Sequence, residues 1–220
     1  MFSDRVDAGQ RLGASLREFT DRECAGDETV VLALPRGGVP VAYQVAKALG
    51  SPLDVFVVRK LGAPLQPELA MGAIASGGVR VINEEVVRAL RVTPEQLAET
   101  AERETLELER REQAYRGDRA PLDVKGKCVL LVDDGVATGY TMRAAVAALR
   151  QREPKKIVVA VPVAAQDTCQ DLKRHADAVI CLMTPYDFAA VGQWYRHFDQ
   201  TSDEEVRLLL ERSAETNRSA

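Results

Sequence analysis

Five short runs of apolar residues define the pattern of the chain, and each has the length of a buried strand. Helical patterns separate most of these runs, and such an alternation favours a parallel sheet with helices on both faces. The sequence therefore predicts an α/β fold around a five-stranded parallel sheet. Its strands are expected near residues 30–34, 53–58, 128–132, 157–163 and 178–183.

The segment between the second and third runs interrupts this alternation. Residues 70–75 and 79–82, which flank a Ser-Gly-Gly turn, are typical of the two strands of a β-hairpin. A capping box with proline at the first helical position begins at Thr93 and starts a long, highly charged helix that reaches about Tyr115. We therefore expect an excursion between two strands of the sheet.

Length and composition fit one globular domain with a substantial core. We expect a single domain over residues 1–220, in which 65–117 is the inserted hairpin with its helices and 184–220 is a small C-terminal hood with a helix. The chain carries 29 basic and 33 acidic residues, a formal charge of −4. This balance offers no electrostatic footprint for nucleic acid or an anionic membrane, so neither is expected as a partner.

The cysteines and the N-terminus indicate in which cellular compartment the protein is expected. Cys24, Cys128, Cys169 and Cys181 form no CxxC pair, and two of them fall inside apolar runs. Most are therefore expected to be small core residues in a reducing compartment. The N-terminus lacks an apolar core of signal-peptide type, and no apolar run reaches membrane-spanning length. We expect a cytoplasmic protein.

The most informative stretch runs from Val129 to Thr141. It joins a buried strand to two adjacent carboxylates, Asp133 and Asp134, and then to a loop of small residues and the start of a helix. Backbone N–H groups and a helix N-terminus suit a phosphate, whereas the two acids suit hydroxyl groups or a cation. The pattern predicts a site for a phosphate that carries a polyhydroxylated group.

Two further strand ends combine cations with glycine. Pro35-Arg36-Gly37-Gly38 follows the first run, and Arg59-Lys60-Leu61-Gly62-Ala63-Pro64 follows the second. Arginine forms bidentate pairs with phosphate oxygens, and a glycine pair lets the backbone approach a ligand closely. Because active sites in such sheets lie outside the carboxyl ends of the strands, we expect these segments to meet the acidic pair.

The stretch 129–141 resembles the phosphoribosyl-diphosphate-binding motif of the type I phosphoribosyltransferases: apolar residues, two acids, and a loop rich in threonine and glycine. Gly135 departs from it, because many members have a small apolar residue or serine there, and we expect this glycine to loosen the loop. The Pro-Arg-Gly-Gly segment occupies the place of the pyrophosphate loop, which often contains a cis or strained peptide. Arg59-Lys60 looks like the start of the mobile loop of adenine phosphoribosyltransferases, which implies a lid. The whole layout resembles a bacterial branch known only as predicted phosphoribosyltransferases.

The resemblance implies an Mg²⁺-dependent glycosyltransferase that uses 5-phosphoribosyl 1-diphosphate, a small-molecule nitrogen acceptor resembling a nucleobase, and pyrophosphate release. Asp133, Asp134, Arg36 and Lys60 would be catalytic, with Mg²⁺ held mainly by substrate and water. The remaining positions would bind substrate. They are Gly37, Gly38, Arg59, Gly135, Val136, Ala137, Thr138, Gly139 and Thr141.

Two other functions stay open at this point. A regulatory protein on the same scaffold would bind a nucleotide or phosphoribosyl diphosphate without turnover. A magnesium-dependent phosphohydrolase fits the acids but not the threonine-glycine loop. The acceptor is not encoded in any pattern of residues 184–200. Family members are often homodimers, and the exposed long helix offers an interface, but the pattern does not decide the oligomeric state.

Overall fold

A computed structural model describes residues 1–64 and 66–218, so Leu65, at the predicted start of the insertion, lies outside the described residues. The central sheet has the order β2-β1-β6-β7-β8, and every neighbouring pair is parallel. The predicted α/β fold with a five-stranded parallel sheet is confirmed. These strands are β1 (Thr29–Ala33), β2 (Leu53–Val55), β6 (Cys128–Val132), β7 (Lys156–Val163) and β8 (Ala178–Met183).

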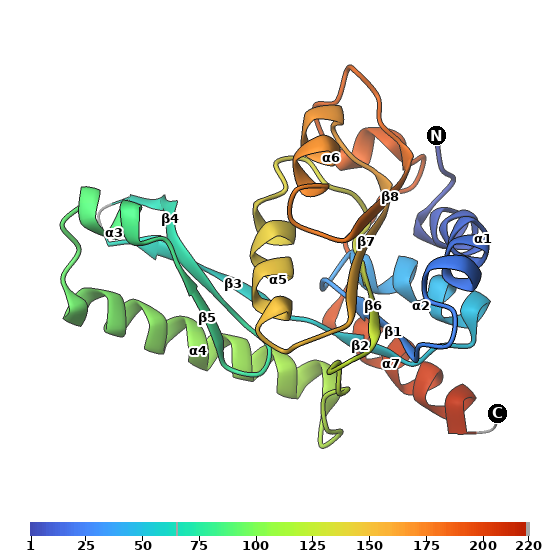
Figure 1. Cartoon of the computed structure of the whole chain (residues 1–220), viewed down its shortest axis with the longest axis horizontal. Coiled ribbons are helices and arrows are strands. Elements are labelled where there is room, and N and C mark those ends of the chain that lie inside the picture. Colours follow the sequence, from blue (N-terminus) through green and yellow to red (C-terminus); the bar gives the residue numbers. More distant parts are fainter. Residues whose placement is uncertain (65, 219–220) are drawn as a thin grey trace.

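Side chains of the central strands alternate between two cores, as the period of a strand requires. Leu130 and Val132 face one core, whereas Val129 and Leu131 face the other. The first core lies beneath α1 and α2, and the second lies beneath α5 (Figure 1). The helices are α1 (Arg5–Glu23), α2 (Gly38–Leu49), α3 (Glu84–Ala89), α4 (Pro94–Arg116), α5 (Tyr140–Arg150), α6 (Gln166–Leu172) and α7 (Asp203–Arg218), with a 3₁₀ turn, η1, at Val191–Trp194.

The inserted segment forms a second, antiparallel sheet of β3 (Val58–Ala63), β4 (Gln66–Ala75) and β5 (Val79–Ile82). Together with α3 and α4 it projects from the central sheet as an arm (Figure 1). The hairpin and the capping box at Thr93 are as predicted. The arm is also joined to the central sheet by a buried ion pair in which Arg116 Nε lies 3.0 Å from Asp54 Oδ1.

The second predicted strand is shorter than expected, since β2 ends at Val55, and the prediction that a loop begins at Arg59 is wrong. The apolar run 53–58 is broken, because the Val57 N–H donates to Ser76 Oγ at 2.8 Å instead of continuing the parallel ladder. Phe56 and Val57, which lie between β2 and β3, are both buried. The apolar pattern of the sequence therefore does not reveal that the strand ends at Val55. Arg59 and Lys60 consequently lie inside β3, paired with β4, and do not begin a loop.

The cysteines also depart in part from the prediction. Cys24 at the end of α1 and Cys128 at the start of β6 are joined by a disulfide, so the expectation of reduced core cysteines is wrong for this pair. Both are buried, as expected. Cys169 and Cys181 are free.

Candidate functional site

The carboxyl ends of β1 and β6 lie side by side in the middle of the central sheet. Ala33 is in register with Val132, and the Leu34 N–H donates to Val132 O at 2.9 Å. The acidic pair follows β6 directly, and residues 35–38 follow β1, with a cis peptide between Pro35 and Arg36. Parallel pairing therefore brings these two predicted segments together.

The contact between the two segments depends on glycine. A β carbon at Gly37 would overlap the Asp134 carboxylate, whose Cγ would be 2.8 Å away. A β carbon at Gly38 would lie 2.9 Å from Asp133 Cα. Neither glycine has a positive φ, so close approach, and not an unusual backbone conformation, requires them.

The two acids are half-buried and differ in their partners. Burial raises the pKa of both carboxyls, and the neighbouring charge of Asp134 raises the pKa of Asp133 further. Arg5 opposes the rise at Asp134, because its Nε donates to Asp134 Oδ2 at 2.8 Å. The Tyr195 hydroxyl donates to the Asp134 carbonyl oxygen at 2.5 Å. The acidic pair is thus held from α1 and from the segment after β8.

Sequence reasoning missed Arg5. Its guanidinium also donates to the Asp199 carbonyl oxygen at 2.6 Å and lies 3.9 Å from the centre of the Phe198 ring. Arg5 is the first residue of α1, where the helix dipole disfavours a cation. A cation in this unfavourable position is the one signal in the sequence that Arg5 binds an anionic group outside its own helix.

The loop from Gly135 to Gly139 joins β6 to α5 and lies against the start of α6. Gly139, with φ +73°, precedes the first residue of α5. In the part of the chain that the structure describes, no acceptor is recorded for the backbone N–H of Ala137, Thr138 or Gly139. Thr138 and Thr141 are exposed at this end of the helix. Unpaired N–H groups and a helix N-terminus together suit an anion.

Gly135 serves close packing and does not loosen the loop. It is buried, and a β carbon there would lie 2.5 Å from Val191 Cγ1 and 3.1 Å from Val163 Cγ1. The Val136 N–H donates to Val163 O at 2.9 Å, which fixes the loop against the end of β7. The glycine therefore lets η1 of the hood rest on the loop, and the expectation of a looser loop is wrong.

Comparison with known sequences identifies the family. The sequence profile of the phosphoribosyl transferase domain matches residues 4–194, which span the acidic pair, the small-residue loop and the Pro-Arg-Gly-Gly segment. The chain belongs to the phosphoribosyl transferase family.

This phosphoribosyl transferase family member is similar in sequence to two curated proteins and in structure to a solved one. A protein of Mycobacterium tuberculosis (strain H37Rv), provisionally named a phosphoribosyl transferase, is 46% identical over 213 residues, which are 97% of this chain and 47% of that protein. The chain thus spans about half the length of this curated relative. Bifunctional protein PyrR of Chloroflexus aurantiacus is 32% identical over 142 residues, covering 62% of this chain and 72% of that protein. The crystal structure of TT1426 from Thermus thermophilus has 43% identity and a TM-score of 0.85, covering 96% of this chain and 98% of that one.

Arg36, one of three cations of the predicted phosphoribosyl transferase site, faces the start of α7. Its Nη1 lies 3.7 Å from Asp203 Oδ1, and the same oxygen accepts a hydrogen bond from the Tyr115 hydroxyl at 3.0 Å. Arg36 and Gly37 line a cavity of about 390 Å³ together with Arg5, Asp134 and residues 198–201. Of the acidic pair, Asp134 lines this cavity.

Arg59 and Lys60 lie elsewhere in the family member. Arg59 Nη2 is 2.6 Å from Glu104 Oε2 of α4. Both cations line a separate cavity of about 620 Å³ between β3 and α4. The acids and the phosphate loop do not line that cavity, so the structure groups Arg36 with the acids but places Arg59 and Lys60 in the arm.

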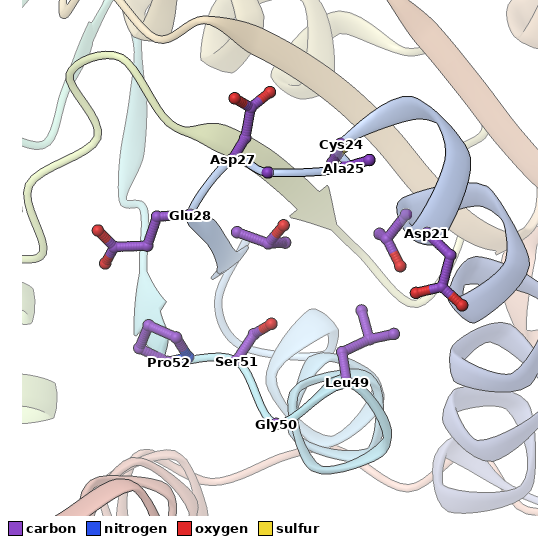
Figure 2. Close-up of a pocket in the computed structure, with 12 residues that line it drawn as sticks. Asp21, Cys24, Ala25, Asp27, Glu28, Leu49, Gly50, Ser51 and Pro52 are labelled. Carbon is purple, nitrogen blue, oxygen red and sulfur yellow. The ribbon is translucent and has the colours of Figure 1, made fainter.

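A third cavity, of about 460 Å³, lies between the C-terminal ends of α1 and α2, and none of the predicted site residues lines it (Figure 2). Asp27 and Glu28 stand at its rim and are already paired with Lys155 and Lys127, at 2.5 and 2.7 Å. We assign no function to this cavity.

Among residues 1–64 and 66–218, no helix is long and apolar enough to cross a membrane.

Proposed function

We propose that the chain transfers the phosphoribosyl group of 5-phosphoribosyl 1-diphosphate to a nitrogen of a nucleobase-like acceptor and releases pyrophosphate. The observation that carries this proposal is the direct contact of residues 35–38 with the acidic pair at the carboxyl ends of β1 and β6. The segment after β1 offers an arginine, and the loop that continues from the two carboxylates offers free N–H groups. A phosphate, a ribose and a diphosphate in one molecule match these three features in order.

The small-residue loop takes the 5-phosphate in this proposal. Residues 137–139 present backbone N–H groups, whereas the Val136 N–H is bonded to Val163 O, and Thr138 and Thr141 add hydroxyl donors at the N-terminus of α5. No full cation is required there, because the helix dipole and several N–H donors together favour a phosphate dianion.

The acids bind the ribose hydroxyls and stabilise the positive charge that develops as the bond to pyrophosphate breaks. Asp133 and Asp134 serve this purpose only as carboxylates, and Arg5 favours the charged form of Asp134. Arg36, with the backbone at Gly37, stabilises the departing pyrophosphate, whereas the Gly38 N–H is bonded to Leu34 O. Arg59 is occupied by Glu104, so the proposed pyrophosphate site rests on Arg36 and its loop.

Magnesium fits this site as a metal bound chiefly by the substrate. The oxygens of Asp133 and Asp134 are hard donors of the kind that Mg²⁺ prefers. Within the described residues, no group of three or more His, Cys, Asp or Glu side chains is arranged to hold a metal. We therefore propose that pyrophosphate and ribose oxygens with water supply most of the ligands. Such an ion, when bound, would supply positive charge beside the leaving group.

Pyrophosphate release tests the proposal. The chain is incubated with 5-phosphoribosyl 1-diphosphate, Mg²⁺ and a panel of purine and pyrimidine bases, and at least one base is expected to give turnover. Asp134→Asn and Arg36→Ala should each lower the rate about 100-fold or more, the scale of losing one charge-stabilising group. Asp118→Asn, a change at an exposed carboxylate elsewhere, is the matched control and should leave the rate unchanged.

Two outcomes would contradict the enzyme proposal. Tight donor binding without pyrophosphate release for any base would favour a regulatory binding protein on the same fold. Full activity in Asp134→Asn, with a melting temperature close to wild type, would place the reaction elsewhere.

A further inference from the structure

Three consecutive carbonyl groups of the phosphate loop are each held by a donor from outside the loop. Val136 O accepts from the Ala165 N–H at 3.1 Å, and Ala137 O accepts from the Thr168 hydroxyl at 2.6 Å. Thr138 O accepts from Arg143 Nη1 at 3.2 Å. Two of these donors come from the start of α6 and the residue before it, and the third comes from α5.

These bonds determine where the N–H groups of the loop point. In a planar trans peptide the C=O and the following N–H point in opposite directions. The cis peptide recorded for the described residues is at Pro35–Arg36, so the peptides of this loop are trans. Holding the carbonyls of residues 136–138 therefore turns the N–H groups of Ala137, Thr138 and Gly139 away from the donors. No acceptor for these three N–H groups is recorded in the described chain.

One of the side chains that hold the loop, Arg143, is itself held by neighbouring residues. Arg143 Nη1 lies 2.9 Å from Asp171 Oδ2 of α6, and its guanidinium lies 5.2 Å from the centre of the Tyr140 ring. Thr168 and Arg143 also crowd Gly139. A β carbon at that glycine would lie 2.7 Å from Thr168 Cγ2 and 3.2 Å from Arg143 Nη1.

We propose that Thr168 and Arg143, the latter oriented by Asp171, are positioning residues that set the affinity of this loop for a phosphate monoester. They act through the loop carbonyls and do not need to touch the ligand. The inference rests on the proposed function, since it assumes that the 5-phosphate occupies this loop. Substitution of Thr168 tests the orientation of the loop without changing the charge near the ligand, because the threonine hydroxyl is neutral.

Calorimetric titration with ribose 5-phosphate tests the inference, and Thr168→Val is the main variant. It keeps the shape of the side chain but removes the hydroxyl, and should weaken binding about three- to tenfold, the contribution of one hydrogen bond. Thr168→Ser restores the hydroxyl and should restore the affinity. Inorganic pyrophosphate, which the proposed function assigns to residues 36–38, should bind Thr168→Val as it binds wild type. The KM for 5-phosphoribosyl 1-diphosphate should rise with little change in kcat.

Matched controls are available in the chain. Thr216→Val removes a hydroxyl that donates to Arg212 O on α7, and Arg150→Met breaks an ion pair with Asp177 at the far end of α5. Both should leave ribose 5-phosphate affinity unchanged, whereas Arg143→Met should lower it. Wild-type affinity for ribose 5-phosphate in Thr168→Val would overturn the inference. Failure of the wild-type protein to prefer ribose 5-phosphate over ribose would instead overturn the proposed function.

Discussion

Gly37→Ala tests the contact on which the candidate site depends. The new β carbon would overlap the Asp134 carboxylate and lie 2.8 Å from its Cγ, whereas ordinary contacts begin at 3.4 Å. The carboxylate or the loop must therefore move by at least about 0.6 Å, the difference between these distances. Such a shift also disturbs the 2.8 Å contact between Asp134 and Arg5.

The loss can be estimated from the bonds at risk. A hydrogen bond to a charged group contributes about 1.5–3 kcal/mol. If the displaced carboxylate loses one such bond to the ribose, the Kd for 5-phosphoribosyl 1-diphosphate should rise about 10- to 100-fold. Overpacking should also cost about 1–3 kcal/mol of unfolding free energy, so the Kd is compared at a temperature at which both proteins are folded.

Isothermal titration calorimetry of the donor with Mg²⁺ measures this change. Gly13→Ala is the matched control, because its β carbon would lie 2.8 Å from Ala48 Cβ in the α1–α2 contact, away from the site. It should destabilise the protein by about 1–3 kcal/mol through overpacking but leave the Kd unchanged. Wild-type donor affinity in Gly37→Ala would refute the reasoning.

Three further predictions concern charge and stability. Arg5→Met removes the cation that opposes the rise in the pKa of Asp134, so this carboxyl should gain its proton at a higher pH. Donor binding, measured as Kd against pH, should therefore weaken at a higher pH than in wild type as the pH is lowered. An unchanged pH profile would contradict this. Arg116→Met leaves Asp54 buried without its partner. Urea unfolding should show a loss of about 3–5 kcal/mol of unfolding free energy. A loss below about 1 kcal/mol, the level of an exposed ion pair, would show that the pair contributes little. Reduction of the disulfide between α1 and β6 should lower stability by about 2–4 kcal/mol, and identical melting with and without reductant would exclude this effect.

The central sheet could be predicted because its inner strands, such as β6 and β7, are buried on both faces, and the half-buried β8 is still a continuous apolar run. A continuous apolar run at β6, β7 or β8 leaves little choice of structure, and the glycines and prolines around it mark its ends. The capping box at Thr93 and the hairpin were equally local signals. The contact between the Asp133–Asp134 pair and residues 35–38 followed from parallel topology alone.

Features that depend on tertiary contacts were not visible in the sequence. The chain leaves the central sheet after Val55 because of hydrogen bonds to Ser76, although the apolar run continues. That change of direction carries Arg59 and Lys60 into the arm. The disulfide joins residues 104 positions apart, and cysteine spacing does not reveal such a pair. Arg5 reaches Asp134 across 129 positions, so only the fold brings them together.

A crystal structure of the protein soaked with 5-phosphoribosyl 1-diphosphate and Mg²⁺ tests the central claim most directly. The account predicts the 5-phosphate on the N–H groups of residues 137–139, the ribose hydroxyls on Asp133 and Asp134, and the diphosphate beside Arg36. Donor bound instead in the cavity between β3 and α4, with its phosphates on Arg59 and Lys60 and the acidic pair free of ligand, would contradict it.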